Sequence, residues 1–292
     1  MTEMTKPTDP ARTIAFQGAP GAYSDLACRQ VFPQMTTLPC AAFEDAFAAV
    51  RDGKAALAMM PIENSVAGRV ADIHHLMPDS GLFIIGEHFE RVNHHLLALP
   101  GATLASLRTV RSHVHALSQC RKLIRELGLT PIIAADTAGS AAEIKERGDP
   151  TVAAIASELA GRIYGLVSLK QNIEDAEHNT TRFLIMSREP QWAPRGGLAV
   201  TTFVFNVRNV PAALYKALGG FATNGINMTK LESYMVEGNF SATQFYADVE
   251  GHPEDRSLKL ALEELSFFSK ELKILGVYRG HPFRATLAEA PQ

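Results

Sequence analysis

The chain opens its regular pattern with an apolar run, a glycine-rich turn and a helical period. In "RTIAFQGAPGAYSDLACRQVF", Gly18 and Gly21 flank the turn between the predicted strand and the predicted helix. Ser24 precedes the helical pattern and is the predicted N-cap. Residues 12–32 therefore predict a strand–turn–helix unit.

Helical spacing and a buried strand follow. Apolar residues at helical spacing predict a helix within 41–53. The continuous apolar run "AALAMMPIEN" is closed by Pro61 and predicts a buried strand that delivers Glu63 and Asn64 at its C-terminal end.

Strands and helices then alternate up to residue 165, which predicts a mainly parallel sheet covered on both faces. In such sheets, ligands bind outside the C-terminal ends of the strands, so the loops at those ends are the candidate site loops. The predicted elements are a helix at 70–77, one long strand or two successive strands at 81–100, strands at 107–113, 131–136 and 151–156, and helices at 116–128, 140–147 and 157–165.

A change of composition separates the last third of the chain. Residues 188–197 hold two prolines, two glycines and the only tryptophan, which indicates an interdomain linker. The order of elements after it is βαββαβ, that of a ferredoxin-like unit. Its strands are expected at 198–207, 226–236, 239–251 and 273–280, and its helices at 210–225 and 256–269.

Composition narrows the class of protein. The 292 residues are 46% hydrophobic and 20% charged, which is typical of a globular enzyme or binding protein, and the length suggests two domains. The net charge of -3 excludes a global electrostatic footprint for nucleic acid. No apolar run is long enough to span a membrane, and the polar N-terminus lacks the apolar core of a secretory signal.

Three cysteines, an odd and widely spaced set, indicate neither a disulfide framework nor a zinc site. A reducing cytoplasm is the compartment that we expect. His113 and His115 alternate in "RSHVHALSQC" and would face opposite sides of an extended segment. Because no His-Glu-x-x-His pattern accompanies them, we expect no metal.

Four stretches carry candidate chemistry. "QGAPGAYSD" can expose backbone N–H groups at a helix start to an anion, although a plain tight turn explains the stretch better when it stands alone. "PIENSVAGRV" either brings an acceptor and a donor to the end of a strand or serves only as a turn. "RSHVHALSQC" contributes polar side chains after another strand. "NTTRF" places uncharged donors beside Arg182, which can hold a carboxylate or pair with an acid of "NIEDAEH". Together they indicate a cleft for a small polar anion.

Taken in order, these stretches resemble the prephenate dehydratase family. "AFQGAPGAYS", "PIENSVAGRV", "GEHF", "SHVHALSQC", "DTAGSAAEI", "AAIASELAGRIYGL" and "NTTRFLIMSR" follow the family's order after residue 12, and the last resembles its TRF signature. The C-terminal residues resemble the ACT regulatory domain that is usually fused to this enzyme.

The resemblance implies an α/β fold with a bilobed catalytic domain of the type II periplasmic-binding-protein kind at 12–187. One lobe would combine the N-terminal segment with the return at 165–187, and the other would be the middle segment. A linker at 188–198 and a ferredoxin-like ACT domain at 199–281 would follow. No cofactor is implied.

The resemblance also implies a substrate and a site. Prephenate would lose CO2 and water in the cleft to give phenylpyruvate, in L-phenylalanine biosynthesis. Thr181 would be the essential residue, a hydrogen-bond donor to the departing oxygen. The substrate-binding residues would be Asn64, Ser112, Gln119, Thr180, Arg182, Glu63 and Ser24. The role of Arg182 remains undecided between substrate anchor and loop brace, and that of Glu63 between acid and positioning group.

The ACT-like segment departs from the family's phenylalanine-binding pattern. Ala212 stands where glycine is typical, Tyr215 stands at a valine position, and Tyr234-Met235 replace Arg-Pro. The effector-binding residues would be Pro211, Ala212, Ala213, Leu214, Glu232 and Ser233, with Tyr234 and Met235 at the apolar end of the pocket. We expect phenylalanine as effector and a homodimer or homotetramer; a domain that only dimerises is the alternative.

Two other functions stay open on the sequence alone. An arogenate dehydratase would share the fold and the chemistry but take the amino acid rather than the keto acid. A non-catalytic amino-acid-binding regulator would share the lobes and the ACT-like domain without chemistry. Neither a membrane nor nucleic acid is expected as a partner.

Overall fold

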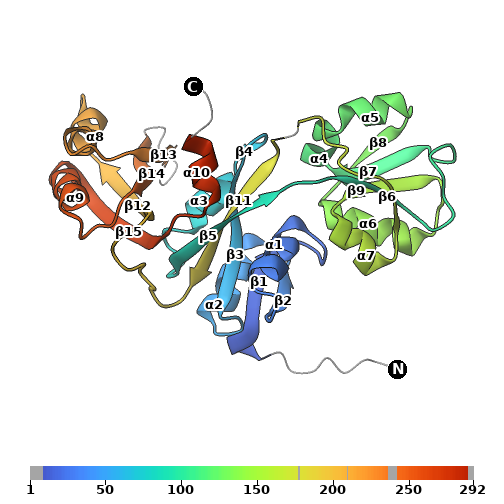
Figure 1. Ribbon diagram of the computed structural model, residues 1–292, viewed down its shortest axis with the longest axis horizontal. Helices are drawn as coiled ribbons and strands as arrows, with labels where there is room; N and C mark the ends of the chain where they lie inside the picture. Colours follow the sequence, from blue (N-terminus) through green and yellow to red (C-terminus); the bar gives the residue numbers. More distant parts are fainter. Residues whose placement is uncertain (1–8, 177, 209, 236–241, 289–292) are drawn as a thin grey trace. The chain divides into compact units, whose positions relative to one another are not determined.

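A computed structural model describes residues 9–176, 178–208, 210–235 and 242–288 (Figure 1). The chain forms two compact units, one made of Met1–Val70 with His88–Phe183, the other of Ala71–Glu87 with Leu184–Gln292. Of residues 12–187, the first unit holds all but 71–87 and 184–187. The second joins the C-terminal third of the chain to a short segment from the first third.

The first lobe is built on a small sheet around β1 (Thr13–Gln17). This strand pairs in parallel with β2 (Thr36–Cys40) and β3 (Leu57–Asn64), and β4 (Gly68–Arg69) folds back antiparallel on β3. The first half of β11 (Thr180–Ser187) lies on the other side of β3. The 3-10 turn η1 (Pro10–Arg12) precedes β1, and α1 (Tyr23–Val31) and α2 (Phe43–Arg51) follow β1 and β2.

Two points differ from the sequence expectations here. Strand β3 runs through Pro61 and delivers Glu63 and Asn64 at its C-terminal end, as predicted, but β2 was not predicted. Ser24 is not the N-cap of α1, because the cap is Ala22 and Ser24 lies inside the first turn. The carboxylate of Asp25, in the first turn of α1, accepts the backbone N–H of Gly21 at 2.8 Å and so satisfies this donor before the helix.

The second lobe is a five-stranded sheet in the order β10-β6-β9-β7-β8. Strands β7, β8 and β9 are parallel, as predicted, but β6 pairs antiparallel with both β9 and β10. The strands are β6 (His95–Ala98), β7 (Thr109–His113), β8 (Thr130–Ala134), β9 (Val152–Ala156) and β10 (Val167–Lys170), and the helices are α4 (Val114–Gln119), α5 (Arg121–Glu126), α6 (Thr137–Arg147) and α7 (Glu158–Tyr164).

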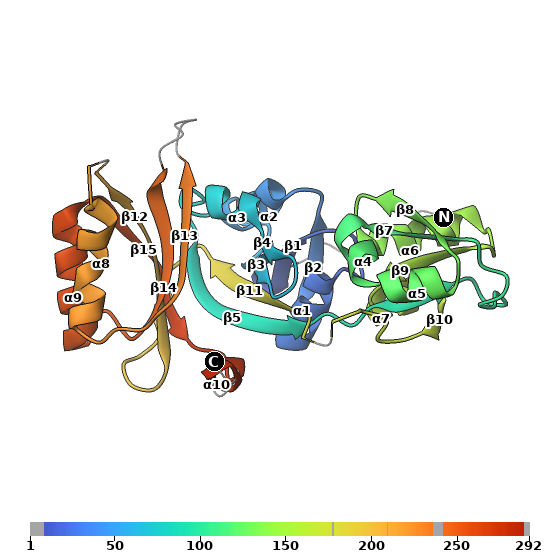
Figure 2. The ribbon, with the colours of Figure 1, turned by 90° about the horizontal axis from the view of Figure 1, so that it is seen from above.

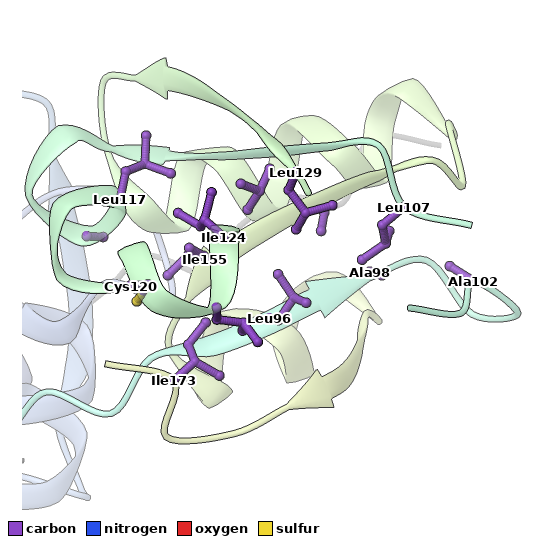
Figure 3. Close-up of a cluster of buried hydrophobic side chains, with 14 residues drawn as sticks. Leu96, Ala98, Ala102, Leu107, Leu117, Cys120, Ile124, Leu129, Ile155 and Ile173 are labelled. Carbon is purple, nitrogen blue, oxygen red and sulfur yellow. The ribbon is translucent and has the colours of Figure 1, made fainter. Parts of the chain in front are cut away.

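The core of this lobe lies between the sheet and helices α4 and α5. Figure 3 shows Leu117 and Ile124 from these helices converging on Ile155 of β9, with Ile173 arriving from the return segment. The single helix predicted for 116–128 is wrong. The segment instead forms two short helices, α4 and α5, which meet at Cys120, where the backbone leaves the helical region at φ -125° and ψ 28°.

The second unit has the predicted ferredoxin-like order. Its antiparallel strands follow the order β13-β14-β12-β15, and helices α8 and α9 lie together on one face of the sheet (Figure 2), where Phe203, Phe221 and Leu265 are buried. The elements are β12 (Ala199–Val207), α8 (Ala213–Thr223), β13 (Met228–Met235), β14 (Ala242–Glu250), α9 (Arg256–Phe268), β15 (Ser269–Arg279) and α10 (Phe283–Ala288).

Residues from the first third of the chain cover the other face of this sheet. On α3 (Ala71–Leu76), His74 makes an edge contact with Tyr246 at 4.9 Å between ring centres. The start of β5 (Phe83–Arg91) pairs with β15 at Gly276 opposite Ile84, where a Cβ on residue 276 would collide with the Ile84 carbonyl. The stretch 81–100 is thus two strands, β5 and β6.

A buried ion pair holds the last helix. Arg284 of α10 donates to both carboxylate oxygens of Glu87, at 2.5 and 2.8 Å, and the N–H of His281 adds a third bond at 2.9 Å. This helix lies beyond residue 281, where the sequence pattern ended. Among the described residues, no helix is both long and apolar enough to cross a membrane.

Candidate active site

Three polar side chains meet where β3 ends and β11 begins. The amide nitrogen of Asn64 donates to Asn179 Oδ1 at 2.8 Å and to Thr181 Oγ1 at 2.9 Å. Its own oxygen accepts the backbone N–H groups of Val66 and Ala67 at 2.9 and 2.8 Å. The "PIEN" and "NTTRF" stretches, more than 110 residues apart, therefore form one array.

The array continues into the second lobe. Asn179 donates from its amide nitrogen to Gln119 Oε1 at 2.9 Å, and His94 Nε2 lies 3.0 Å from the same oxygen. The other ring nitrogen of His94 lies 2.9 Å from the hydroxyl of Tyr23, which is also 2.8 Å from the Asn93 carbonyl oxygen. One hydrogen-bonded row therefore runs from α1 to Thr181.

The backbone sets the direction of the bonds that join Thr181, Asn64, Asn179 and Gln119. The N–H groups of residues 66 and 67 are donors only, so the oxygen of Asn64 must face them and its nitrogen must face Asn179 and Thr181. Asn179 then presents its oxygen to Asn64 and its nitrogen to Gln119. Gln119 consequently presents its oxygen to Asn179.

The chemical consequence lies in two groups that keep hydrogens to donate. Because Thr181 Oγ1 accepts from Asn64, its hydroxyl hydrogen points elsewhere, and no described residue accepts it. The amide nitrogen of Gln119 likewise has no acceptor in the described part of the chain. Two neutral donors are thus held ready for a ligand.

A pocket of about 310 Å³ adjoins the row, in the size range of small-molecule sites. It contains two carboxylates that the sequence reasoning missed. Glu174 accepts the N–H of His94 at 2.9 Å, and Asp175 accepts the N–H groups of Arg121 and Lys122 at 3.0 and 3.2 Å. The lining residues are Val66, Ala67, His115, Ser118, Gln119, Glu174, Asp175, Ala176 and Asn179.

Arg182 braces the strands beneath this site. Its guanidinium is buried and donates to Glu63 Oε1 at 2.9 Å, and it lies 6.0 Å from the ring centre of Phe89. Among its described partners is therefore Glu63. Neither Arg182 nor Glu63 lines the pocket.

Three further predicted residues lie away from the pocket. Ser112 is fully buried and donates to the Ile155 carbonyl oxygen at 2.6 Å, so it ties β7 to β9. The backbone N–H of Thr180 is taken by Ser65 Oγ at 2.9 Å. Ser24 is buried within α1. None of the three lines the pocket.

The glycine-rich turn joins the two lobes. The carbonyl oxygen of Gly21 accepts the Ser157 hydroxyl at 2.5 Å, and a Cβ on residue 21 would lie 2.7 Å from Ala160 Cα. The hydroxyl of Tyr164 reaches the Pro20 carbonyl at 2.9 Å. The turn therefore packs directly against α7.

Burial controls the titration of the inner end of the row. It lowers the pKa of His94 from its ordinary value, against the hydrogen bond that the ring donates to Gln119 and the charge of Glu174, which raise it. Burial also raises the pKa of Tyr23 well above its ordinary value, with the nearby Cys120 and Glu174 adding to the effect. His94 is therefore favoured as the neutral imidazole and Tyr23 as the neutral phenol.

The two histidines of "SHVHAL" act locally. His113 caps α4 by accepting the N–H of His115 at 3.3 Å, and their ring centres are 5.0 Å apart. The prediction that they face opposite sides fails, because the chain turns into a helix between them. His115 lines the pocket.

Comparison with known proteins places this geometry in a family. The family model described as prephenate dehydratase matches residues 14–191. The chain belongs to the prephenate dehydratase family. It is accordingly a dehydratase, of the carbon–oxygen lyase class.

Relatives of this prephenate dehydratase family member span almost its full length. A Komagataeibacter europaeus protein named bifunctional N-acyl-homoserine lactone acylase/prephenate dehydratase is 59% identical, over 94% of this chain and 98% of its own. Arogenate dehydratase/prephenate dehydratase 1 of Arabidopsis thaliana is 39% identical, over 91% and 71%. The solved Arthrobacter aurescens prephenate dehydratase in complex with L-Phe is 32% identical, over 95% and 96%, with a TM-score of 0.84.

The predicted fold class is confirmed, with two α/β lobes and a βαββαβ unit after them. In that unit, Ala212 is the N-cap of α8 and has a left-handed backbone, φ 62° and ψ 14°. Tyr234 is buried and its ring centre lies 5.4 Å from that of His75, whereas Met235 is half exposed. Neighbouring strand residues face opposite ways, so Glu232 and Ser233 lie on opposite faces of β13.

Proposed function

We propose that this chain converts prephenate to phenylpyruvate, CO2 and water in L-phenylalanine biosynthesis. The observation that carries the proposal is the hydrogen bond from Asn64 to Thr181 Oγ1 at 2.9 Å. It leaves the Thr181 hydroxyl as a donor; neither Thr181 nor Asn64 lines the pocket, but Asn179, which accepts from Asn64, does. A departing ring hydroxyl is the group that such a donor serves.

The reaction breaks two bonds to the ring. The bond to the ring carboxylate breaks and releases CO2, its electron pair enters the ring, and the hydroxyl leaves from the opposite position as the ring becomes aromatic. The hydroxyl takes up a proton and leaves as water. Thr181 is too weak an acid to supply that proton alone, so it donates a hydrogen bond to the departing oxygen. An aligned donor of this kind contributes about 10²–10³ in rate.

Substrate placement falls to the rest of the row. Asn64 and Asn179 hold Thr181 in direction, and the amide nitrogen of Gln119 faces the pocket as a donor to a substrate oxygen. Arg182 and Glu63 position β11 rather than touch the substrate. The test is turnover of prephenate by the purified protein, followed as phenylpyruvate formation. Absence of turnover on prephenate and on arogenate would contradict the proposal.

Arogenate is a second candidate substrate, favoured by two carboxylates at the pocket. Glu174 and Asp175 would oppose a keto acid with two negative charges and attract the ammonium group of arogenate. Their N–H partners reduce this effect but do not remove the charge. The comparison of kcat/KM on the two substrates decides between them.

Hydrolysis of N-acyl-homoserine lactones is a second candidate activity. The relative that is 59% identical carries this activity in its name. A mostly apolar groove of about 620 Å³, with Val114, Leu117 and Ile133 in its wall, shares Ser118 with the pocket and suits an acyl chain. The described pocket residues, however, include no hydroxyl hydrogen-bonded to a base, since Ser118 donates to the His115 carbonyl at 2.8 Å.

One pair of variants separates the two activities. Ile133→Asp should lower release of the acyl chain and leave dehydration unchanged, because residue 133 lines only the groove. Thr181→Ala should remove dehydration. Loss of both activities in Ile133→Asp would show damage to the lobe rather than to the groove.

The C-terminal unit is proposed as an ACT domain, residues 199–281, after a linker at 188–198, that binds L-phenylalanine and lowers activity. The ferredoxin-like strand order and the likeness to the phenylalanine-bound Arthrobacter enzyme support this role. The turn Pro211 to Leu214 offers its backbone to the effector, and Glu232 and Ser233 would act from β13. We propose a homodimer or homotetramer in the cytoplasm; light scattering on the full chain tests the assembly.

A further inference from the structure

His94 does not touch the pocket, yet it is part of the row that ends there. Its ring is buried, and its Nε2 lies 3.0 Å from Gln119 Oε1. The direction of bonds set by the backbone of residues 66 and 67 makes that atom of Gln119 an oxygen. An oxygen opposite Nε2 requires Nε2 to carry the hydrogen.

The partner on the other ring nitrogen is compatible with this tautomer. With the hydrogen on Nε2, the neutral ring accepts at Nδ1, 2.9 Å from the Tyr23 hydroxyl, whose single hydrogen is shared with the Asn93 carbonyl oxygen at 2.8 Å. Tyr23 is itself held by α1, at the lobe joint formed by the glycine-rich turn. The Nδ1–H tautomer would place the lone pair of Nε2 against the Gln119 oxygen, which would then accept only from Asn179.

We propose that His94, held as the neutral Nε2–H tautomer by the Gln119 oxygen, is a positioning residue that orients Gln119 toward the substrate. Two donors, His94 Nε2–H and the Asn179 amide, saturate Gln119 Oε1. The amide nitrogen of Gln119 is thereby turned toward the pocket. Without His94 the Gln119 side chain loses one of the two bonds that fix its direction.

This inference rests on the proposed dehydration for its kinetic test but not for its spectroscopic test. The ¹⁵N spectrum of histidine-labelled full-length protein at neutral pH should contain a neutral Nε2–H ring that disappears in His94→Gln. A neutral Nδ1–H ring for His94 would overturn the proposal whatever substrate the enzyme takes. If neither prephenate nor arogenate is turned over, the proposed function fails and the spectrum still decides the tautomer.

Kinetics then test whether His94 acts through Gln119. His94→Leu should lower kcat/KM about 10-fold, the order of one lost orienting hydrogen bond. In a Gln119→Ala background the same change should cost less than about 2-fold, because the residue it orients is gone. An undiminished loss in that background would overturn the proposal, since a general structural defect would add independently.

Conservative variants distinguish the two ring nitrogens. The amide nitrogen of glutamine can replace Nε2–H, whereas that of asparagine lies near Nδ1, so His94→Gln should recover most activity and His94→Asn should not. His95→Gln is the matched control, because His95 is equally buried and contacts Ser168 at 2.9 Å rather than the row. Equal losses in His94→Gln and His94→Asn, with His95→Gln intact, would contradict the proposal.

Discussion

Asn64 donates to Thr181, and not the reverse, because the oxygen of Asn64 is occupied by two backbone N–H groups. Asn64→Asp should therefore be as damaging as loss of Thr181, although the side chain keeps its shape. A carboxylate offers only acceptors, so the Thr181 hydroxyl would turn to donate to it instead of to the substrate. We expect kcat to fall about 10²-fold. Near-parent kcat in a normally folded Asn64→Asp would show that Thr181 is not the donor.

Removal of the donor itself gives the direct test. Thr181→Ala should lower kcat by about 10²–10³ with an unchanged melting temperature, and Thr181→Ser should retain most of the activity. Thr180→Ala serves as the comparison, because its side chain points to the opposite face of the strand and should cost much less. Turnover of Thr181→Ala within threefold of the parent would exclude the assigned role.

Substrate placement should depend on the row more than on the nearby histidines. Gln119→Ala and Asn64→Ala should each reduce kcat/KM more than His113→Ala or His115→Ala, because only the first two hold the donors in place. Steady-state kinetics of the four variants decides the order. Larger losses in the histidine variants, or inactivation by a chelator, would point to metal chemistry.

Much of the scaffold was predictable because it depends on local pattern. The strand at 57–64 and the start of β11 follow from apolar runs, and the polar residues at their ends follow from turn chemistry. The resemblance supplied Thr181, Asn64 and Gln119. Nothing local shows that these ends meet, and the bonds of Asn179 to both Asn64 and Gln119 appear only once the lobes are folded.

The errors have long-range causes. The helix predicted at 116–128 breaks at Cys120 because of Asp175, more than 50 residues away. The side chain of Asp175 accepts the N–H groups of Arg121 and Lys122, and its backbone N–H donates to the Gln119 carbonyl oxygen at 2.6 Å. His94 and Tyr23 were missed because buried polar residues in apolar runs resemble core positions. Their pairing is a tertiary event that no spacing in the sequence records.

Arg182 tests the difference between a brace and a substrate anchor. Arg182→Leu should lower the unfolding free energy by about 1–3 kcal/mol, less than for a fully buried pair because Glu63 is partly exposed. KM should stay within about twofold, since the guanidinium does not line the pocket. Arg188→Leu, at an exposed cation after the same strand, is the control. A large rise in KM at parent-like stability would make Arg182 an anchor.

Substrate choice should respond to one pocket carboxylate. Glu174→Gln should lower the ratio of kcat/KM for arogenate over prephenate by about three- to fivefold, the effect of a half-exposed charge on an ammonium group. Glu126→Gln removes a carboxylate on α5 outside the pocket and should leave the ratio unchanged. Parallel assays on both substrates measure it, and an unchanged ratio in Glu174→Gln would remove Glu174 from substrate choice.

Ala212 carries a backbone strain that glycine would relieve, and the same change should tighten the effector site. Its left-handed φ of 62° costs an L-residue about 1–2 kcal/mol, and the greater flexibility of unfolded glycine offsets part of that, so Ala212→Gly should raise stability by about 0.5–1 kcal/mol. Ala222→Gly, within α8, should lower the stability instead.

Because the Cβ of residue 212 lies at the turn whose backbone is proposed to hold phenylalanine, removing this Cβ in Ala212→Gly should also strengthen phenylalanine binding. Calorimetry with phenylalanine on the full-length parent and on Ala212→Gly measures this, with inhibition assayed in parallel. Stabilisation without any binding or inhibition at millimolar phenylalanine would leave the C-terminal unit with assembly as its only role.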